Sequence, residues 1–110
     1  MKFEISLTNE SGETVQLQFP SGQQFEIIVR DQKGNIVYQY SEGKVFTLAI
    51  VTKEIKPRET ITWTDVWDMK VNGKRVEPGK YFVTAQLQIM ALNGESVDKK
   101  QFTIEKKVVV

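Results

Sequence analysis

Apolar residues recur at every second position along most of this chain, and this alternation constrains the fold more than any other feature. The alternating positions are, in chain order, Phe3, Ile5, Leu7, Val15, Leu17, Phe19, Phe25, Ile27, Val29, Ile36, Tyr38, Tyr40, Phe46, Leu48, Ile50, Ile61, Trp63, Tyr81, Val83, Ala85, Leu87, Ile89, Phe102 and Ile104. Because residues two apart share one face of a β-strand, the pattern predicts strands that turn one face to a core. Ala49 and Val51 add apolar groups beside the run at 46–50, so we expect that strand to be covered on both faces. No stretch has a convincing helical period.

Turn-forming residues separate the runs. Asn72-Gly73, Pro78-Gly79 and Asn93-Gly94 are strong turn pairs, since glycine and asparagine tolerate a positive φ and proline presets its own φ. Short strands with a turn every eight to twelve residues are typical of all-β sandwiches and barrels. We favour an immunoglobulin-like antiparallel β-sandwich of seven to eight strands. Tyr81 then either reaches back with its hydroxyl at a corner or only packs, and both interpretations stay open.

Length and charge restrict the class of protein. A chain of 110 residues, 40% hydrophobic and 26% charged, suits a single domain spanning residues 1–110. Its formal net charge of +1 argues against nucleic-acid binding. No cysteine and no long apolar run is present, so we expect a cytoplasmic protein without disulfides or membrane spans. The Asn9-Glu10-Ser11 string fits a glycosylation acceptor but is better interpreted as a turn.

The residue types needed for most catalysis are missing. The chain has no histidine and no cysteine, which removes the commonest general base, the thiol nucleophile and the usual zinc ligands. Asp65 and Asp68 flank Trp67 and resemble a glycosidase carboxylate pair only superficially, because nothing else converges on them. We therefore expect a protein that is not an enzyme and that needs no cofactor or metal. Trp63 is predicted to lie in the core, and for Trp67 packing is favoured over an interface role.

Loops carried by a rigid sandwich are its usual binding surface. Alternate connections between successive antiparallel strands emerge at the same end, and this count groups residues 20–23, 41–44 and 68–78 at one pole. The opposite pole then receives the compact turns at 10–12, 31–35, 56–59 and 93–94. The predicted partner-binding residues are Pro20, Ser21, Gly22, Gln23, Ser41, Glu42, Gly43, Lys44, Trp67, Asp68, Met69, Lys70, Val71, Asn72, Gly73, Lys74 and Arg75.

Four segments together resemble the intracellular proteinase inhibitors of the BsuPI type. They are FPSGQQFEIIVRD at 19–31, YSEGKVFT at 40–47, TDVWD at 64–68 and EPGKYFV at 77–83. The resemblance implies a cytoplasmic immunoglobulin-like domain that inhibits intracellular subtilisin-type serine proteases and forms its complex without a cofactor. It implies no particular reactive site.

Two mechanisms of inhibition are consistent with the predicted loops. The long loop at 68–78 could occupy the protease cleft like a substrate, with Met69 or Val71 in a specificity pocket. Alternatively, the three loops of one pole could plug the cleft as a wedge, and their grouping favours this second mechanism. A different class of function, a non-catalytic interaction module with a non-protease partner, is the alternative.

Overall fold

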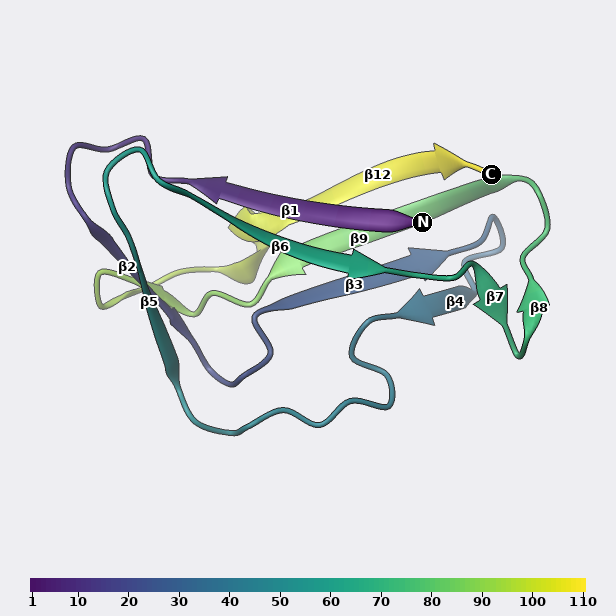
Figure 1. Cartoon of the computed structure of the whole chain (residues 1–110), viewed down its shortest axis with the longest axis horizontal. Helices are drawn as coiled ribbons and strands as arrows, with labels where there is room; N and C mark the ends of the chain where they lie inside the picture. Colours follow the sequence, from purple (N-terminus) through teal and green to yellow (C-terminus); the bar gives the residue numbers. More distant parts are fainter.

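The alternating runs form antiparallel strands in the computed structural model, which describes residues 1–110 (Figure 1). The strands are β1 (Lys2–Thr8), β2 (Val15–Phe19), β3 (Phe25–Arg30), β4 (Ile36–Gln39), β5 (Val51–Ile55), β6 (Thr60–Val66), β7 (Lys70–Val71), β8 (Lys74–Arg75), β9 (Lys80–Leu87), β10 (Ala91–Leu92), β11 (Glu95–Ser96) and β12 (Thr103–Val109). The only helix is a short 3₁₀ turn, η1 (Lys99–Phe102). Eight of the twelve strands have four or more residues. The predicted all-β fold is confirmed.

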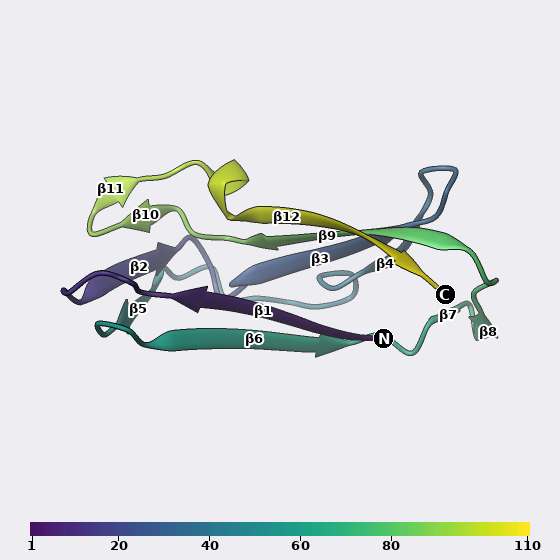
Figure 2. The same ribbon diagram turned by 90° about the horizontal axis from the view of Figure 1, so that it is seen from above.

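The strands pack as a sandwich of antiparallel sheets. One sheet has the order β12-β9-β3-β4. A second four-stranded sheet has the order β11-β10-β2-β5, β1 and β6 form a two-stranded pair, and β7 and β8 form a separate hairpin. Figure 2 shows the β1-β6 pair as a layer apart from β9 and β12. The chain passes between the sheets at the β2–β3 and β4–β5 connections, so these two connections are crossovers and not hairpins.

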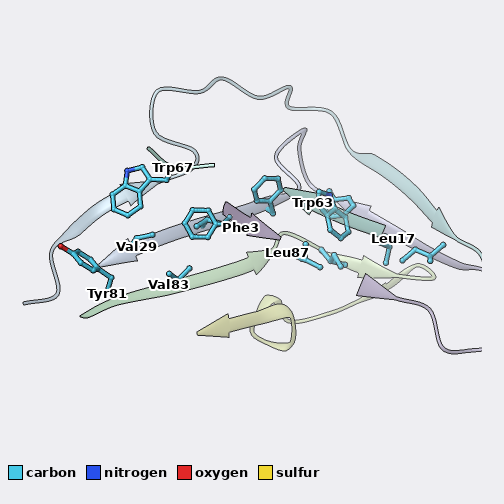
Figure 3. Close-up of a cluster of buried hydrophobic side chains, with 13 residues drawn as sticks. Phe3, Leu17, Val29, Trp63, Trp67, Tyr81, Val83 and Leu87 are labelled. Carbon is cyan, nitrogen blue, oxygen red and sulfur yellow. The ribbon is translucent and has the colours of Figure 1, made fainter. Parts of the chain in front are cut away.

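The core is a cluster of 13 buried hydrophobic residues drawn from both sides of the sandwich (Figure 3). Phe19, at the end of β2, packs edge-on against Trp63 of β6 with ring centroids 6.3 Å apart. The Trp67 ring stacks on Tyr38 at 5.4 Å. Burial of Trp63 confirms its predicted place in the core, and burial of Trp67 confirms that packing outweighs an interface role for its ring.

Tyr81 uses both its ring and its hydroxyl. The ring is buried, and the hydroxyl donates a hydrogen bond of 2.6 Å to the carbonyl oxygen of Glu77. A tyrosine that reaches back a few residues to the backbone is the corner found in immunoglobulin-like sandwiches. The hydroxyl interpretation of Tyr81 is therefore confirmed. This bond holds the chain where it enters β9.

The predicted strand at 46–50 is wrong. These residues form no strand, and β5 begins only at Val51. In β5 the residues that pair with β2 include Val51 opposite Phe19 and Ile55 opposite Val15. Ile55 is fully buried, so the odd-numbered positions of β5 turn towards the core. A continuous strand would point Leu48 and Ile50, at even positions, away from that core, because the side-chain period is two.

Tyr38 makes the free energy of unfolding fall at alkaline pH. Its hydroxyl donates a hydrogen bond to Asp65. Burial raises the pKa of Tyr38, and the bond to the Asp65 carboxylate raises this pKa further. The hydroxyl therefore keeps its proton to higher pH in the folded state than in the unfolded chain. The stability that this group contributes is fully present below pH 10, the ordinary pKa of tyrosine, and is lost as pH rises above it.

Replacing Tyr38 by phenylalanine tests this coupling. We expect Tyr38→Phe to lower the free energy of unfolding at pH 7 by about 1 kcal/mol, the net value of one hydrogen bond. We also expect a shallower loss of stability between about pH 10 and 11.5 than in the wild type. Urea unfolding at several pH values measures both effects. Burial also raises the pKa of Tyr40, so the stability of the variant should still fall somewhat at alkaline pH. Equal alkaline slopes in both proteins would contradict the assignment.

Candidate functional site

Two of the predicted binding loops lie together on one side of the sandwich. The backbone N–H of Gly22 donates a 2.8 Å hydrogen bond to the carbonyl oxygen of Thr47. The Glu26 carboxylate accepts from the Gln23 side chain at 3.1 Å and from the backbone N–H of Ser41 at 3.2 Å. The two loops are thus tied to each other and to β3. We call residues 20–23 and 41–50 the loop surface.

Contacts around Tyr40 shape the start of the second loop. Its ring stacks on Phe25 at 4.2 Å, which anchors the end of β4 to the core. Gly43 has a φ of 75°, and this left-handed conformation turns the chain. The Lys44 ammonium then lies 4.2 Å from the centre of the Tyr40 ring and donates to the Tyr40 carbonyl oxygen at 2.7 Å. After this turn the chain runs along the lower side of the molecule in Figure 1 until it enters β5.

Residues 45–50, which we call the apolar segment, expose three large hydrophobic side chains. The exposed fractions are 98% for Val45, 92% for Leu48 and 61% for Ile50. Single exposed apolar residues are common on protein surfaces, but three within six residues form a patch of the kind that marks an interaction site. Phe46 is only half-buried and contacts the Tyr40 ring, with centroids 6.2 Å apart.

Sequence reasoning missed Val45, Leu48 and Ile50 because alternation alone placed Leu48 and Ile50 in a strand. One signal could have separated them. The apolar positions of the run are even-numbered up to Ile50, whereas Val51 and Ile55 are odd-numbered. A single strand cannot bury both sets on one face, so the change of phase marks the point where the strand begins.

The third predicted loop lies elsewhere, so the grouping of three loops at one pole is wrong. In Figure 1 the β7–β8 hairpin is at the right-hand end, away from the loop surface. That end also holds residues 31–35, because the Gln32 side chain lies close to Gly79, within 3.3 Å of where a Cβ would be. The count of alternating connections failed since β2 and β3 belong to different sheets and residues 46–50 form no strand.

The predicted residues from 67 to 75 form a compact hairpin and not an open loop. Trp67 is buried, and its indole N–H donates to the Lys70 carbonyl oxygen at 3.4 Å. Met69 has a φ of 64° and packs partly against the core. Asn72 and Gly73 have φ values of 52° and 79°, so they form the tight turn that their sequence predicted. The exposed positions of the hairpin are Asp68, Lys70, Val71, Asn72, Gly73, Lys74 and Arg75.

The carboxylates that were weighed as a catalytic pair have structural partners. Asp65 accepts the hydrogen bond from Tyr38, and Asp68 accepts from the backbone N–H of Lys70 at 3.0 Å. No group of three or more histidine, cysteine or acidic side chains is arranged to hold a metal ion. Among the helical residues, no stretch has the length and apolar character needed to cross a membrane. The loop surface, with its apolar segment, offers contact area for another molecule.

A second apolar surface is a groove of about 260 Å³ between β1 and the β9–β12 pair. Phe3 and Ile5 line one wall, and Val83, Ala85 and Ile104 line the other. β1 and β12 are each at the edge of their sheets, so both present unpaired backbone groups beside the groove.

Comparison with known proteins places this geometry in a family. A search of curated proteins found no match. A family model described as "Intracellular proteinase inhibitor" (BsuPI) matches residues 1–92 of the 110. The matched region contains the whole loop surface and the β7–β8 hairpin, and it confirms the resemblance seen in the four sequence segments. The chain therefore belongs to the BsuPI family of intracellular proteinase inhibitors.

Proposed function

We propose that residues 1–110 act as one immunoglobulin-like domain in the cytoplasm and inhibit a serine protease of the subtilisin type by blocking its cleft with the loop surface. The observation that carries this proposal is the exposed apolar segment, which is tied to the neighbouring loop through Gly22 and Thr47. The domain needs no cofactor in this role and catalyses no reaction itself. The family to which the chain belongs supports a protease as the partner.

The hydrogen bonds that hold the loop surface suit an inhibitor. A protease–inhibitor interface buries about 800 Å² on each partner, and few of its side chains carry most of the binding energy. A loop held in one conformation binds more tightly than a flexible peptide, because less ordering entropy is lost. Hydrogen bonds to Glu26 and Thr47 supply such constraints here. The aliphatic side chains of Val45 and Leu48 suit a protease with a hydrophobic specificity pocket.

The separation of the β7–β8 hairpin from the loop surface argues against a wedge made of three loops. The hairpin is also a poor substrate mimic, because its tip is a tight turn with two positive φ values and its strands pair with each other. The proposed contact therefore keeps the predicted residues 20–23 and 41–44, leaves out residues 67–75 and adds residues 45–50.

Titration of a protease tests the function. A purified intracellular subtilisin-type serine protease is incubated with increasing domain, and its initial rate is measured on a chromogenic peptide. We expect the rate to fall to background at micromolar domain, with a metalloprotease unaffected as the control. An unchanged rate at micromolar domain would reject the inhibitor function for that protease.

The alternative function is an interaction module with a non-protease partner. The apolar groove between the edge strands β1 and β12 favours it, because an extended peptide can add to an exposed sheet edge. Binding of an extended apolar peptide by a domain that leaves the protease rate unchanged at micromolar concentration would support this alternative.

A further inference from the structure

We propose that the apolar segment enters the protease cleft as an extended strand, with the Leu48 side chain in the specificity pocket and the Gly22–Thr47 contact as its anchor. This inference rests on the proposed inhibitor function and names the residues that perform it. Leu48 lies outside the four segments that resemble the family, one residue beyond the segment at 40–47.

The backbone of the apolar segment is free to pair with another chain. Outside the regular strands, the only backbone–backbone hydrogen bond that involves residues 45–50 is the one from Gly22 to the Thr47 carbonyl. None of these six residues has a positive φ. An unpaired, extended segment can add as a strand to the edge of a partner, which gives affinity through the main chain and specificity through side-chain pockets. Apart from the bond at Thr47 the apolar segment is unpaired, with one bend at Ala49, whereas the backbone of the β7–β8 hairpin is already paired.

Leu48 is the side chain best placed to enter a pocket. It is almost fully exposed, and it follows Thr47 directly, so its backbone is held by the anchored residue. Val45 is slightly more exposed, at 98% against 92%, but it lies two residues before the anchor and is smaller. Phe46 is half-buried and contacts Tyr40, which leaves it unable to enter a pocket without breaking that contact.

Gly22 is a positioning residue for the apolar segment. A Cβ on Gly22 would lie 2.6 Å from the Thr47 Oγ1 atom and 3.3 Å from the Thr47 backbone nitrogen. Real Cβ atoms essentially never approach another atom to 2.6 Å, so a larger residue at this position would have to displace Thr47. The close approach also allows the Gly22 N–H to reach the Thr47 carbonyl. The segment is thereby fixed before it meets the protease, which lowers the entropy lost on binding.

The first experiment compares Leu48→Asp with Val71→Asp in inhibition of an intracellular subtilisin-type serine protease. Leu48 is 92% exposed, so Leu48→Asp should keep the thermal midpoint of the wild type, whereas Val71 is 37% exposed in β7, so Val71→Asp is compared at equal folded fraction. We expect Leu48→Asp to raise the inhibition constant by about 100-fold or more, as for a central interface residue, and Val71→Asp to change it less than about threefold.

Three outcomes contradict different claims. A wild-type domain that does not inhibit overturns the proposed function together with this inference. A wild type that inhibits, with a Leu48→Asp variant equally potent, overturns only the inference. If Val71→Asp greatly weakens inhibition while Leu48→Asp leaves the inhibition constant unchanged, the β7–β8 hairpin is the contact and the inference is also overturned.

The second experiment tests the anchor. We expect Gly22→Ala to raise the inhibition constant by about tenfold, because the new methyl group displaces Thr47 and with it the Leu48 backbone. Adding Thr47→Ala removes the nearest clashing atom and should restore most of the affinity. Gly12→Ala is the matched control, since no atom lies within 4 Å of a Cβ at Gly12. A Gly22→Ala variant that inhibits like the wild type, or a loss that Thr47→Ala does not reduce, would overturn the anchor.

Discussion

Phe19→Ala is expected to lower the free energy of unfolding by about 3–5 kcal/mol, the range for deletion of a buried aromatic ring. Phe19 is fully buried and packs edge-on against Trp63. Only 15 of the 110 residues are buried, so few other contacts can absorb the cavity. Because a domain of this size is stable by about 5–15 kcal/mol in total, the loss is a large fraction of its stability.

Urea unfolding at 25 °C measures this loss, with Phe82→Ala as the control. Phe82 lies in β9 but is 44% exposed, so we expect its truncation to cost less than about 1.5 kcal/mol. A cost for Phe19→Ala no larger than that for Phe82→Ala would contradict the proposed core. Phe19 has no exposed surface to offer a partner, so the variant should lose inhibition in proportion to its unfolded fraction. Leu48→Asp should instead lose inhibition while fully folded, which separates the scaffold from the contact.

Asn9→Asp is expected to lower the free energy of unfolding by about 2–4 kcal/mol, because the buried Ile55 carbonyl and the partly buried Glu13 carbonyl are left without a donor. Asn9 is buried, and its side-chain nitrogen donates to the carbonyl oxygens of Glu13 at 2.7 Å and Ile55 at 2.9 Å. Its side-chain oxygen accepts from the Ser11 backbone N–H at 3.0 Å and hydroxyl at 2.6 Å. An aspartate keeps the size and the acceptor but turns a carboxylate towards two carbonyl oxygens.

The matched control for this substitution is Asn72→Asp. Asn72 is exposed in the β7–β8 turn, where aspartate also tolerates a positive φ, so we expect a change within about 0.5 kcal/mol. The difference in free energy of unfolding between Asn9→Asp and the wild type should shrink at acidic pH, because a protonated carboxyl regains one donor. Chemical unfolding at neutral and acidic pH measures both variants. A loss of stability that is small at neutral pH, or that grows as pH falls, would contradict the role of Asn9 as a donor to the Glu13 and Ile55 carbonyls.

These contacts also settle the interpretation of the Asn9-Glu10-Ser11 string. The Asn9 side-chain nitrogen is occupied by two backbone acceptors, and its backbone N–H donates to the Glu59 carbonyl at 3.0 Å. The string is therefore a turn, as the sequence predicted; it follows β1 and is hydrogen-bonded to the residues just before β6.

Local signals in the sequence were sufficient where a residue acts through its nearest neighbours. Alternation found the faces of β2, β3 and β9, because the core selects every second side chain. The turns at Asn72-Gly73 and Asn93-Gly94 were found because their positive φ values depend on the residue itself. The corner at Tyr81 was foreseen as one of two interpretations, and the hydrogen bond to Glu77 decided between them.

The candidate site was only partly predictable. Residues 20–23 and 41–44 were identified and do lie together, but the apolar segment was taken for a strand and the β7–β8 hairpin was assigned to the wrong end. Both errors have one cause. The alternation of apolar residues predicts that a segment is extended, but it does not predict which strand that segment will pair with.

By itself, the sequence determined that the chain is all-β, where it turns, and which side chains can form a core, because these properties follow from each residue and its immediate neighbours. Only the tertiary structure decided that β2 and β3 belong to different sheets, and that Leu48 faces solvent beside the loop at 20–23. Those two facts depend on hydrogen bonds and packing between residues distant in sequence, such as Gly22 with Thr47, which no local pattern encodes.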